Sequence, residues 1–244
     1  MKLPNPQIVK LRISNKALQG LKILHLSDLH INKKTSLHSI ENLVRLCHTL
    51  PYNIAVLTGD IIDCKTENIM PQLLALNQLK RTFYISGNHD LFYGIEKLNA
   101  ILSHFTFLDN QHTFIEYRHQ KIALVGISDR FSSFFGIKRD EKKSLSFLQK
   151  TPNAILLAHQ PKDYLLALKS NTPLFLCGHT HGGQIFPFGY IVKLFQPFIQ
   201  GIHYKNNTAI YVNKGLGTWG IHKRYKAPSE ITLLELYSSC VHLF

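Results

Sequence analysis

Three apolar runs in the first part of the chain, residues 23–26, 54–57 and 83–85, each end abruptly in polar residues. Runs of this kind are typical of buried strands, and open α/β sheets place their ligands at the carboxyl ends of such strands. We therefore expect the polar residues to share one site. They are Asp28 and His30 after the first run, Asp60 and Asp63 after the second, and Asn88, His89 and Asp90 after the third.

Two later apolar runs repeat the design. Residues 154–158 lead to His159, and residues 174–177 lead through Gly178 to His179 and His181. A single His or Asp after a strand is ordinarily a turn former or a satisfied polar residue. Five runs that end alike are harder to ascribe to chance, so the pattern predicts a site built from five strand ends.

Helical spacing of apolar residues appears between these strands. Helices are expected over residues 39–50, 70–80, 95–103 and 139–150, with Pro161 placed to open another. Residues 113–117 and 121–126 read as a β-hairpin, and the remaining strands are expected over residues 8–13, 209–212 and 231–236. No strong helix is expected in the last third. Helices and strands alternate in the first part of the chain, and the last part contains mainly strands. This order predicts helices outside a two-sheet core.

Length and cysteine spacing bound the fold further. A chain of 244 residues with 45% hydrophobic residues can bury a sizeable core, and we expect a single domain over residues 1–244. Its four cysteines are far apart and form no Cys-x-x-Cys pair, which argues against a disulfide framework or a structural zinc site. A reducing compartment fits this pattern.

The ends of the chain and its hydropathy bear on location. The first residues lack the apolar stretch of a secretory signal, and no run approaches the roughly 18 apolar residues of a spanning helix. We expect a cytoplasmic protein, with peripheral contact at the inner membrane as an option. The oligomeric state stays open.

The formal net charge of +13 predicts attraction to polyanions, whether nucleic acid, an anionic membrane or a phosphorylated substrate. The lysines are dispersed rather than gathered in one block, and no helix-turn-helix, zinc-finger or RNA-binding signature is present. We therefore expect no specific nucleic-acid partner. A solvated basic surface without a specific partner is the plainer interpretation of the charge.

The donor types at the strand ends indicate a metal site. Carboxylate, imidazole and amide oxygen together suit divalent manganese, iron, zinc or nickel. Seven such ligands are too many for one tetrahedral zinc, but they fit two ions that share a carboxylate. Two ions of this kind polarise a phosphoryl oxygen and lower the pKa of a bridging water, so the set predicts phosphoester hydrolysis.

The ordered motifs Asp28-x-His30, Gly59-Asp60-x-x-Asp63, Gly87-Asn88-His89-Asp90, His159 and Gly178-His179-x-His181 resemble those of the calcineurin-like metallophosphoesterase superfamily. The resemblance runs from about Leu21 to Leu236. It implies an α/β fold, a four-layer α/β/β/α sandwich with a dinuclear metal site at the carboxyl ends of its strands.

The same resemblance implies a role for each matched residue. It places Asp28, His30 and His181 on one ion, Asn88, His159 and His179 on the other, and Asp60 between them. A metal-bridging hydroxide would be the nucleophile. His89 would act as the catalytic acid, oriented by Asp63, and manganese would be the expected metal.

A narrower branch, the bacterial phosphoesterases similar to YkuE, is also similar to this chain around residues 178–185, 214–218 and 228–231. The branch includes enzymes that cleave UDP-2,3-diacylglucosamine in lipid A synthesis, which implies a phosphorylated and lipid-linked substrate. Lys214 and Arg224 are expected near its phosphates because an Arg fork matches phosphate geometry. The alternatives are a soluble substrate, such as a cyclic nucleotide or a nucleic-acid end, and a non-catalytic binding scaffold of the same fold.

Residues 185–199 are unusually apolar for a segment beside such a centre, and Pro and Gly break them too often for one core helix. They either pack against the second sheet or form an acyl-chain surface or membrane-dipping flap. In the second case they would act with another loop as an apolar surface rimmed by cations. That loop carries Phe131, Phe134, Phe135, Lys138 and Arg139.

Overall fold

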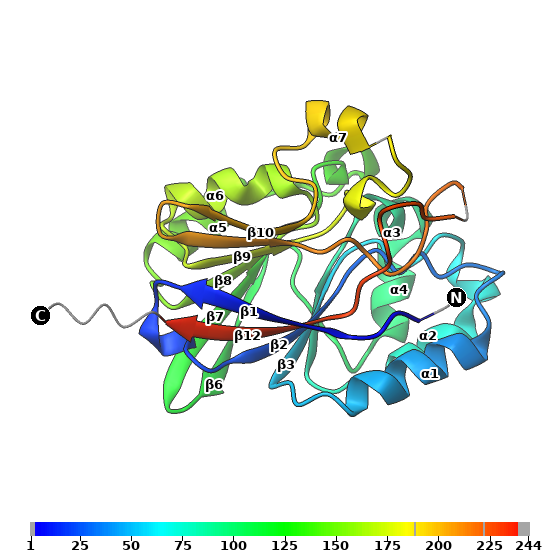
Figure 1. The fold of residues 1–244 in the computed structure, drawn as a ribbon, viewed down its shortest axis with the longest axis horizontal. Helices are drawn as coiled ribbons and strands as arrows, with labels where there is room; N and C mark the ends of the chain where they lie inside the picture. Colours follow the sequence, from blue (N-terminus) through cyan, green and yellow to red (C-terminus); the bar gives the residue numbers. More distant parts are fainter. Residues whose placement is uncertain (1–2, 188, 222, 239–244) are drawn as a thin grey trace, which may run out of the picture.

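The computed structural model describes residues 3–187, 189–221 and 223–238, and it contains two six-stranded sheets (Figure 1). In spatial order, the first sheet consists of β1 (Gln7–Ile13), β12 (Thr232–Ser238), β2 (Lys22–Leu26), β3 (Ile54–Thr58), β4 (Thr82–Ile85) and β5 (Thr106–Phe107). The second consists of β10 (Gly201–Lys205), β11 (Thr208–Val212), β9 (Leu174–Cys177), β8 (Ala154–Leu157), β7 (Gln120–Gly126) and β6 (His112–Tyr117).

Helices lie on the outer face of each sheet (Figure 1). Against the first sheet pack α1 (Leu37–His48), α2 (Met70–Leu76) and α4 (Ile95–Ile101). Against the second pack α5 (Glu141–Gln149) and α6 (Tyr164–Lys169). The short helix α3 (Asn88–Tyr93) adds Leu91 to the first of these helix layers, whereas α7 (Gly189–Phe195) has no buried residue.

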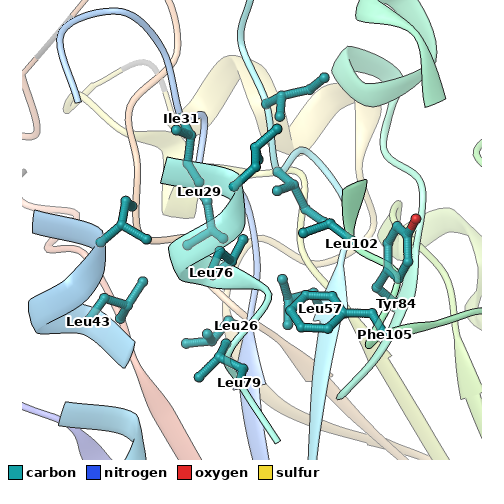
Figure 2. Packing of buried hydrophobic residues seen from close by; sticks show 14 of the residues in the cluster. Leu26, Leu29, Ile31, Leu43, Leu57, Leu76, Leu79, Tyr84, Leu102 and Phe105 are labelled. Atoms are coloured by element: carbon teal, nitrogen blue, oxygen red, sulfur yellow. The ribbon is translucent and has the colours of Figure 1, made fainter. Parts of the chain in front are cut away.

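Three apolar clusters separate four layers. One lies under α1, α2 and α4, and Figure 2 shows its members Leu26, Leu57 and Leu76 packed together. A second fills the space between the sheets, and a third lies under α5 and α6. Because each sheet buries both of its faces, its central strands are continuous apolar runs, as the sequence shows. The predicted four-layer sandwich is confirmed.

Helix α1 illustrates how local sequence sets these elements. The Ser36 side chain caps its first turn by accepting from the backbone N–H of Ser39. Ile40, Leu43 and Cys47 recur at helical spacing and are buried. The predicted helix over residues 39–50 is confirmed, with bounds two residues nearer the N-terminus.

Several predicted boundaries differ from the structure. Helix α2 ends at Leu76 rather than at residue 80, because the chain leaves the helix at Asn77 to begin β4. The Gly87 motif does not simply follow a strand: β4 ends at Ile85, and Asn88 begins the short helix α3. The prediction of no strong helix in the last third is wrong at α7, and the edge strand β10 was not predicted.

Two negative expectations concern covalent and membrane structure. Cys47, Cys64 and Cys177 are free thiols, whereas Cys240 lies outside the described residues. Across the described ranges, no helix combines the length and the apolar character needed to cross a bilayer.

Candidate metal centre

Parallel pairing brings the predicted residues to one edge of the two sheets. Strands β2, β3 and β4 run parallel to one another, as do β7, β8, β9 and β11. Five of the residues that follow these strands have left-handed backbone with φ between 44° and 72°. Non-glycine residues rarely adopt this conformation, and it persists where the surroundings hold it. The five are Asp28, His30, Asp60, His179 and His181.

Two glycines allow the loops to meet this closely. A Cβ atom on Gly87 would lie 2.1 Å from Asp60 Oδ1, and one on Gly178 would lie 1.9 Å from Ser27 Oγ. Both distances are far inside van der Waals contact. The glycines of the Gly87 and Gly178 motifs are therefore required by close packing around the carboxylates.

The first group of candidate ligands consists of Asp28, His30 and His181, whose ligand atoms all lie within 4.8 Å of one another. The two imidazole Nε2 atoms, of His30 and His181, are 3.0 Å apart. His181 Nε2 also lies 3.5 Å from Asp28 Oδ1. Nitrogen ligands sit about 2.1 Å from a divalent ion, so two nitrogens at this spacing can hold the same ion.

The second group consists of Asp60, His159 and His179. His159 Nε2 lies 3.3 Å from Asp60 Oδ2 and 3.1 Å from His179 Nδ1. The same Asp60 Oδ2 atom is 3.6 Å from Nε2 of His30 in the first group. One carboxylate oxygen thus faces both groups.

Unsatisfied buried atoms show that the donor set fits divalent ions. Asp28 Oδ1 and Asn88 Oδ1 are buried and have no hydrogen-bond partner within the described part of the chain. A buried polar atom without a partner costs about 1–3 kcal/mol unless something else satisfies it. Both are hard oxygen donors beside imidazoles, which is the environment that divalent manganese, iron or zinc prefers.

Neighbouring groups fix how each ligand points. The Nδ1 atom of His159 lies 2.7 Å from the Thr58 carbonyl oxygen, to which it donates, leaving Nε2 free for an ion. Asp28 Oδ2 accepts from the backbone N–H of His179 at 3.0 Å. Asp60 Oδ1 accepts from the backbone N–H of His89 at 2.8 Å. Each carboxylate therefore keeps its other oxygen for the centre.

Burial and charge set the protonation of these groups. Burial lowers the pKa of His30 and His179 to about 4 and that of His181 to about 3, which keeps these rings neutral, as metal ligation requires. Burial alone would raise the pKa of Asp60, but His159 beside it holds that pKa well below its usual range. The Asp60 charge in turn outweighs burial and raises the pKa of His159.

His89 and Asp63 form a pair at the rim of the centre. His89 Nδ1 lies 2.8 Å from Asp63 Oδ1, and both side chains are partly exposed. Burial lowers the pKa of His89, but the hydrogen bond to Asp63 and the charge of Asp60 outweigh it, so the pKa is raised. With Nδ1 engaged by Asp63, Nε2 is the nitrogen left to exchange a proton with a bound molecule.

Asp90 ties two loops of the centre together. Its buried carboxylate accepts from the backbone N–H groups of Ile61, Ile62 and Gly87, at 2.8, 3.0 and 2.9 Å. Burial raises the pKa of Asp90 to about 7. The carboxylate joins the loop after β3 to the start of α3, so its contacts are with the backbone rather than with the ligand atoms.

Arg224 lies behind the first ligand group rather than in an open cavity. Its Nη2 atom is 3.0 Å from His181 Nδ1, and other guanidinium nitrogens donate to the carbonyl oxygens of Lys214 and Gly217 at 2.9 and 2.8 Å. Because a guanidinium only donates, His181 Nδ1 accepts here, and a neutral ring then carries its hydrogen on Nε2. Ion binding at Nε2 of His181 requires this contact to rearrange.

Lys214 is likewise held by the protein. Its Nζ atom lies 3.2 Å from Oε2 of Glu230, which is buried. The structure thus brings the seven predicted ligands and the His89–Asp63 pair to one place. It places Lys214 and Arg224 against internal partners, and their role beside substrate phosphates stays a prediction.

Sequence reasoning missed a polar network under the centre. His25 Nε2 lies 2.9 Å from Thr58 Oγ1, which donates to Ser27 Oγ at 2.8 Å. Thr58 also offers its carbonyl oxygen to His159. Burial lowers the pKa of His25 to about 3. The only sequence signal was a histidine inside an otherwise apolar strand.

A cavity of about 700 Å³ opens onto the centre. Its floor includes Asp60, Asn88, His89 and His181, and its walls are mainly apolar. The apolar walls consist of Ile185, Ile191, Val192, Phe195, Trp219 and Ile221. The Gln184 side chain holds one wall by donating to the carbonyl oxygens of Trp219 and Ile221.

The apolar segment 185–199 is largely exposed, so the interpretation that it packs against the second sheet is wrong for most of it. Phe186, Leu194 and Phe195 are 48%, 80% and 63% exposed, whereas Phe198 is buried. Phe188 lies outside the described residues.

The expected rim of cations is only partly present. Lys138 is exposed, but Arg139 turns inward, with Nη2 2.7 Å from Oδ1 of the buried Asp163. Arg139 therefore serves the interior and does not contribute to an open surface.

Comparison with known proteins identifies relatives that are described as phosphoesterases. A family model described as calcineurin-like phosphoesterase matches residues 21–183. A Helicobacter pylori protein described as an uncharacterized metallophosphoesterase is 36% identical over 228 residues, covering 88% of this chain and 60% of that protein. The uncharacterized metallophosphoesterase YkuE of Bacillus subtilis is 30% identical over 233 residues, covering 90% of this chain and 80% of that protein.

Solved structures share the fold. A dimetal phosphatase from Danio rerio superposes with a TM-score of 0.56 at 9% identity, covering 81% of this chain and 88% of that chain. At this identity the likeness concerns the fold alone. The present chain spans about 60% of the length of the Helicobacter relative.

Proposed function

The chain belongs to the calcineurin-like phosphoesterase family, and we propose that it is a hydrolase that uses two divalent metal ions to cleave a phosphoester or phosphoanhydride bond. The observation that carries the proposal is the position of Asp60, whose Oδ2 atom faces a histidine of each ligand group at 3.3 and 3.6 Å. A carboxylate so placed can be shared by two ions. Manganese is the metal we propose.

The residues proposed to hold the ions fall into two sets joined by Asp60. Asp28, His30 and His181 would hold one ion, and Asn88, His159 and His179 the other. Two bound ions polarise a phosphoryl oxygen, lower the pKa of a shared water and steady the displacement at phosphorus. The protein contributes the imidazoles of these residues, carboxylates with one free oxygen each, and a strained backbone that keeps them in place.

His89 is proposed to handle the leaving group. Asp63 holds Nδ1, so Nε2 points away from that carboxylate and can donate a proton to the departing oxygen. Both side chains are partly exposed, and His89 lines the cavity. A positioned acid of this kind is worth about 10²–10⁴-fold in rate.

The substrate we propose is amphiphilic, a nucleotide-sugar lipid such as UDP-2,3-diacylglucosamine. The cavity of about 700 Å³ supports this choice, because it joins the candidate metal ligands to apolar walls formed by Ile191, Phe195 and Ile221. An acyl chain bound there would leave its phosphate near Asp60 and His89. A small, fully polar substrate would leave these apolar walls unused.

The experiment is hydrolysis by the manganese-loaded protein of UDP-2,3-diacylglucosamine and, in parallel, of the soluble diester bis-p-nitrophenyl phosphate, with Asn88→Ala as the blank. Release of UMP at a much higher kcat/KM than nitrophenol would support the lipid substrate. Turnover of the soluble diester alone would keep the two-ion reaction and exclude this lipid. Hydrolysis of neither would favour a non-catalytic scaffold.

A further inference from the structure

Helix α7 is apolar, yet none of its residues is buried. Ile191, Leu194 and Phe195 are 48%, 80% and 63% exposed, and Tyr190 beside them is 61% exposed. A helix of this composition ordinarily buries one face against its own protein. We refer to Tyr190, Ile191, Leu194 and Phe195 as the α7 cluster; within the described residues it has no covering element.

A second exposed group lies on α3 and on the 3₁₀ turn η3 (Ser132–Phe135) with its preceding residue. It consists of Phe92, Phe131, Phe134 and Phe135, which are 66%, 44%, 81% and 41% exposed. We call it the phenylalanine cluster. Its members contact one another, since the Phe92 and Phe135 rings meet edge to face with centroids 6.3 Å apart.

The two clusters lie on either side of His89. Asn88 and His89 line the cavity walled by Ile191 and Phe195 of the α7 cluster, and they also line the cavity that contains all four phenylalanines. Exposed apolar side chains of both clusters therefore lie next to the candidate metal centre. Large apolar patches rimmed by polar groups mark contact surfaces rather than ordinary solvent-facing protein.

The charge around the α7 cluster is one-sided. No acidic residue stands between Asp163 and Glu230, a stretch that includes α7 and the Trp219 loop. Cations lie directly among its aromatic rings: Lys193 Nζ is 5.5 Å from the Tyr190 ring centroid, and Lys226 Nζ is 4.6 Å from that of Phe186. Of the basic residues of the stretch, Lys193 lies on α7, and Lys223 and Lys226 follow the Trp219 loop.

We propose that the α7 cluster and the phenylalanine cluster together dock the protein on an anionic lipid bilayer, with the metal centre facing the membrane. Exposed Leu, Ile, Phe and Tyr flanked by lysines are what interfacial elements present to the headgroup region. Anionic lipid adds attraction for each nearby Lys. A nucleic acid would use the lysines but would gain nothing from Leu194 or Phe134, so the combination favours a lipid surface.

The test is sedimentation of the full chain with vesicles of phosphatidylcholine alone or mixed with phosphatidylglycerol. The wild type is expected to bind the mixed vesicles, and more weakly as salt is raised. The double variant Phe134→Ser, Leu194→Ser removes the two most exposed apolar residues of the clusters and is expected to bind at least about tenfold more weakly. The matched control, Leu74→Ser with Leu165→Ser, alters leucines that are 51% and 48% exposed on α2 and α6, and it should bind as the wild type does.

Wild-type binding to mixed vesicles that the Phe134, Leu194 variant retains in full would overturn the proposal, as would absence of wild-type binding. Sedimentation velocity tests whether the face binds a second copy of the chain. A wild type that is dimeric and a double variant that is monomeric would assign the face to self-association. A DNA duplex is the third occupant to be tested. If DNA displaced the protein from vesicles and bound the wild type and the variant equally well, the basic face would be assigned to nucleic acid.

Docking and hydrolysis can fail separately. The double variant is expected to hydrolyse bis-p-nitrophenyl phosphate as the wild type does, because neither substituted residue contacts the candidate ligands. Vesicle binding without any hydrolysis would leave the docking surface standing and remove the proposed enzyme. Hydrolysis without vesicle binding would support the proposed enzyme and exclude the docking surface.

Discussion

His89 Nδ1 and Asp63 Oδ1 lie 2.8 Å apart, although one residue belongs to helix α3 and the other follows β3. The contact orients the ring through one nitrogen and leaves the other at the mouth of the cavity. It is the contact expected of a histidine that acts as a proton donor whose direction is set by a carboxylate.

Removing this proton donor is expected to slow hydrolysis without emptying the metal site. His89→Ala should lower kcat on an alkyl phosphodiester by about 10²–10⁴-fold, while bound metal per chain stays unchanged. The loss should be much smaller on bis-p-nitrophenyl phosphate, because nitrophenolate leaves without needing a proton. Equal losses on both substrates would contradict the role of His89 as the acid.

Asp63→Ala should give a milder form of the same defect. The carboxylate only orients His89, so a smaller fall in kcat is expected, with the same dependence on the leaving group. Asp63→Asn, which keeps an oxygen able to accept from Nδ1, should recover part of the rate. A variant that instead lost its metal would place Asp63 among the ligands.

Arg224 is expected to affect metal binding more than substrate binding. Its guanidinium contacts His181 Nδ1 and holds the carbonyl oxygens of Lys214 and Gly217, and burial lowers the pKa of Arg224 to about 10. Arg224→Ala should weaken metal affinity by about tenfold, because losing the hydrogen bonds to the carbonyl oxygens of Lys214 and Gly217 loosens the loop that packs on Asp28. The contact with His181 Nδ1 does not add to this loss, because it must rearrange before Nε2 binds an ion. Metal titration followed by assay at saturating metal separates the effects: a persistent rise in KM would restore Arg224 as a phosphate-binding residue.

Gly178 should tolerate no side chain. A Cβ atom there would lie 1.9 Å from Ser27 Oγ and 2.4 Å from Asp28 Oδ2, so Gly178→Ala must displace a ligand loop. We expect a loss of about 1–3 kcal/mol in the free energy of unfolding together with weaker metal binding. Gly189→Ala is the control, because its Cβ would meet nothing nearer than 3.6 Å and should leave both quantities unchanged.

Asp109 predicts a pH dependence of stability. Burial raises the pKa of Asp109 to about 6, although its carboxylate accepts from Ser86. Between pH about 4 and about 6, the folded protein thus keeps a proton that the unfolded chain has released, so this group's contribution lowers the free energy of unfolding as pH rises. The contribution amounts to about 2–3 kcal/mol at one pKa unit per 1.36 kcal/mol.

Urea unfolding at pH about 4.5 and about 7 measures this term. Asp109→Asn should lose less stability over that interval than the wild type, because the amide does not titrate. The exposed Glu116→Gln supplies the baseline for a carboxylate removed from the surface. A pH response of Asp109→Asn equal to that of the wild type would show that Asp109 contributes nothing to it.

Local patterns predicted the parts of the fold that depend on local chemistry. Buried strands such as β9 (Leu174–Cys177) are continuous apolar runs, and their carboxyl ends locate the ligands because parallel pairing is regular. The strand and loop sequences do not encode which carbonyl oxygen or carboxylate lies behind each imidazole. The contact between the Thr58 carbonyl oxygen and His159, for example, depends on how the sheet that contains β3 stacks on the sheet that contains β8.

The features that the sequence did not predict have physical causes of the same kind. Helix α7 was not expected because it is only seven residues long and lies between Pro187 and Pro197. Ile191, Leu194 and Phe195 do have helical spacing, but they bury no face that would mark a core helix. The partners of Arg224, which are carbonyl oxygens and His181 Nδ1, could not be predicted because only the folded loops bring them together. Arg139 was likewise expected at the surface and instead pairs with buried Asp163. The partner of a long side chain depends on which groups the tertiary structure brings within its reach.

The most direct measurement is metal content and hydrolysis of bis-p-nitrophenyl phosphate during manganese titration of the chelator-treated protein, for the wild type and Asp60→Asn. We predict that the wild type binds two ions per chain and becomes active only as the second binds. Asp60→Asn, which weakens the group facing both ligand sets, should lose the second ion and nearly all activity. Full wild-type activity in excess chelator, or undiminished activity of Asp60→Asn, would contradict the two-ion centre.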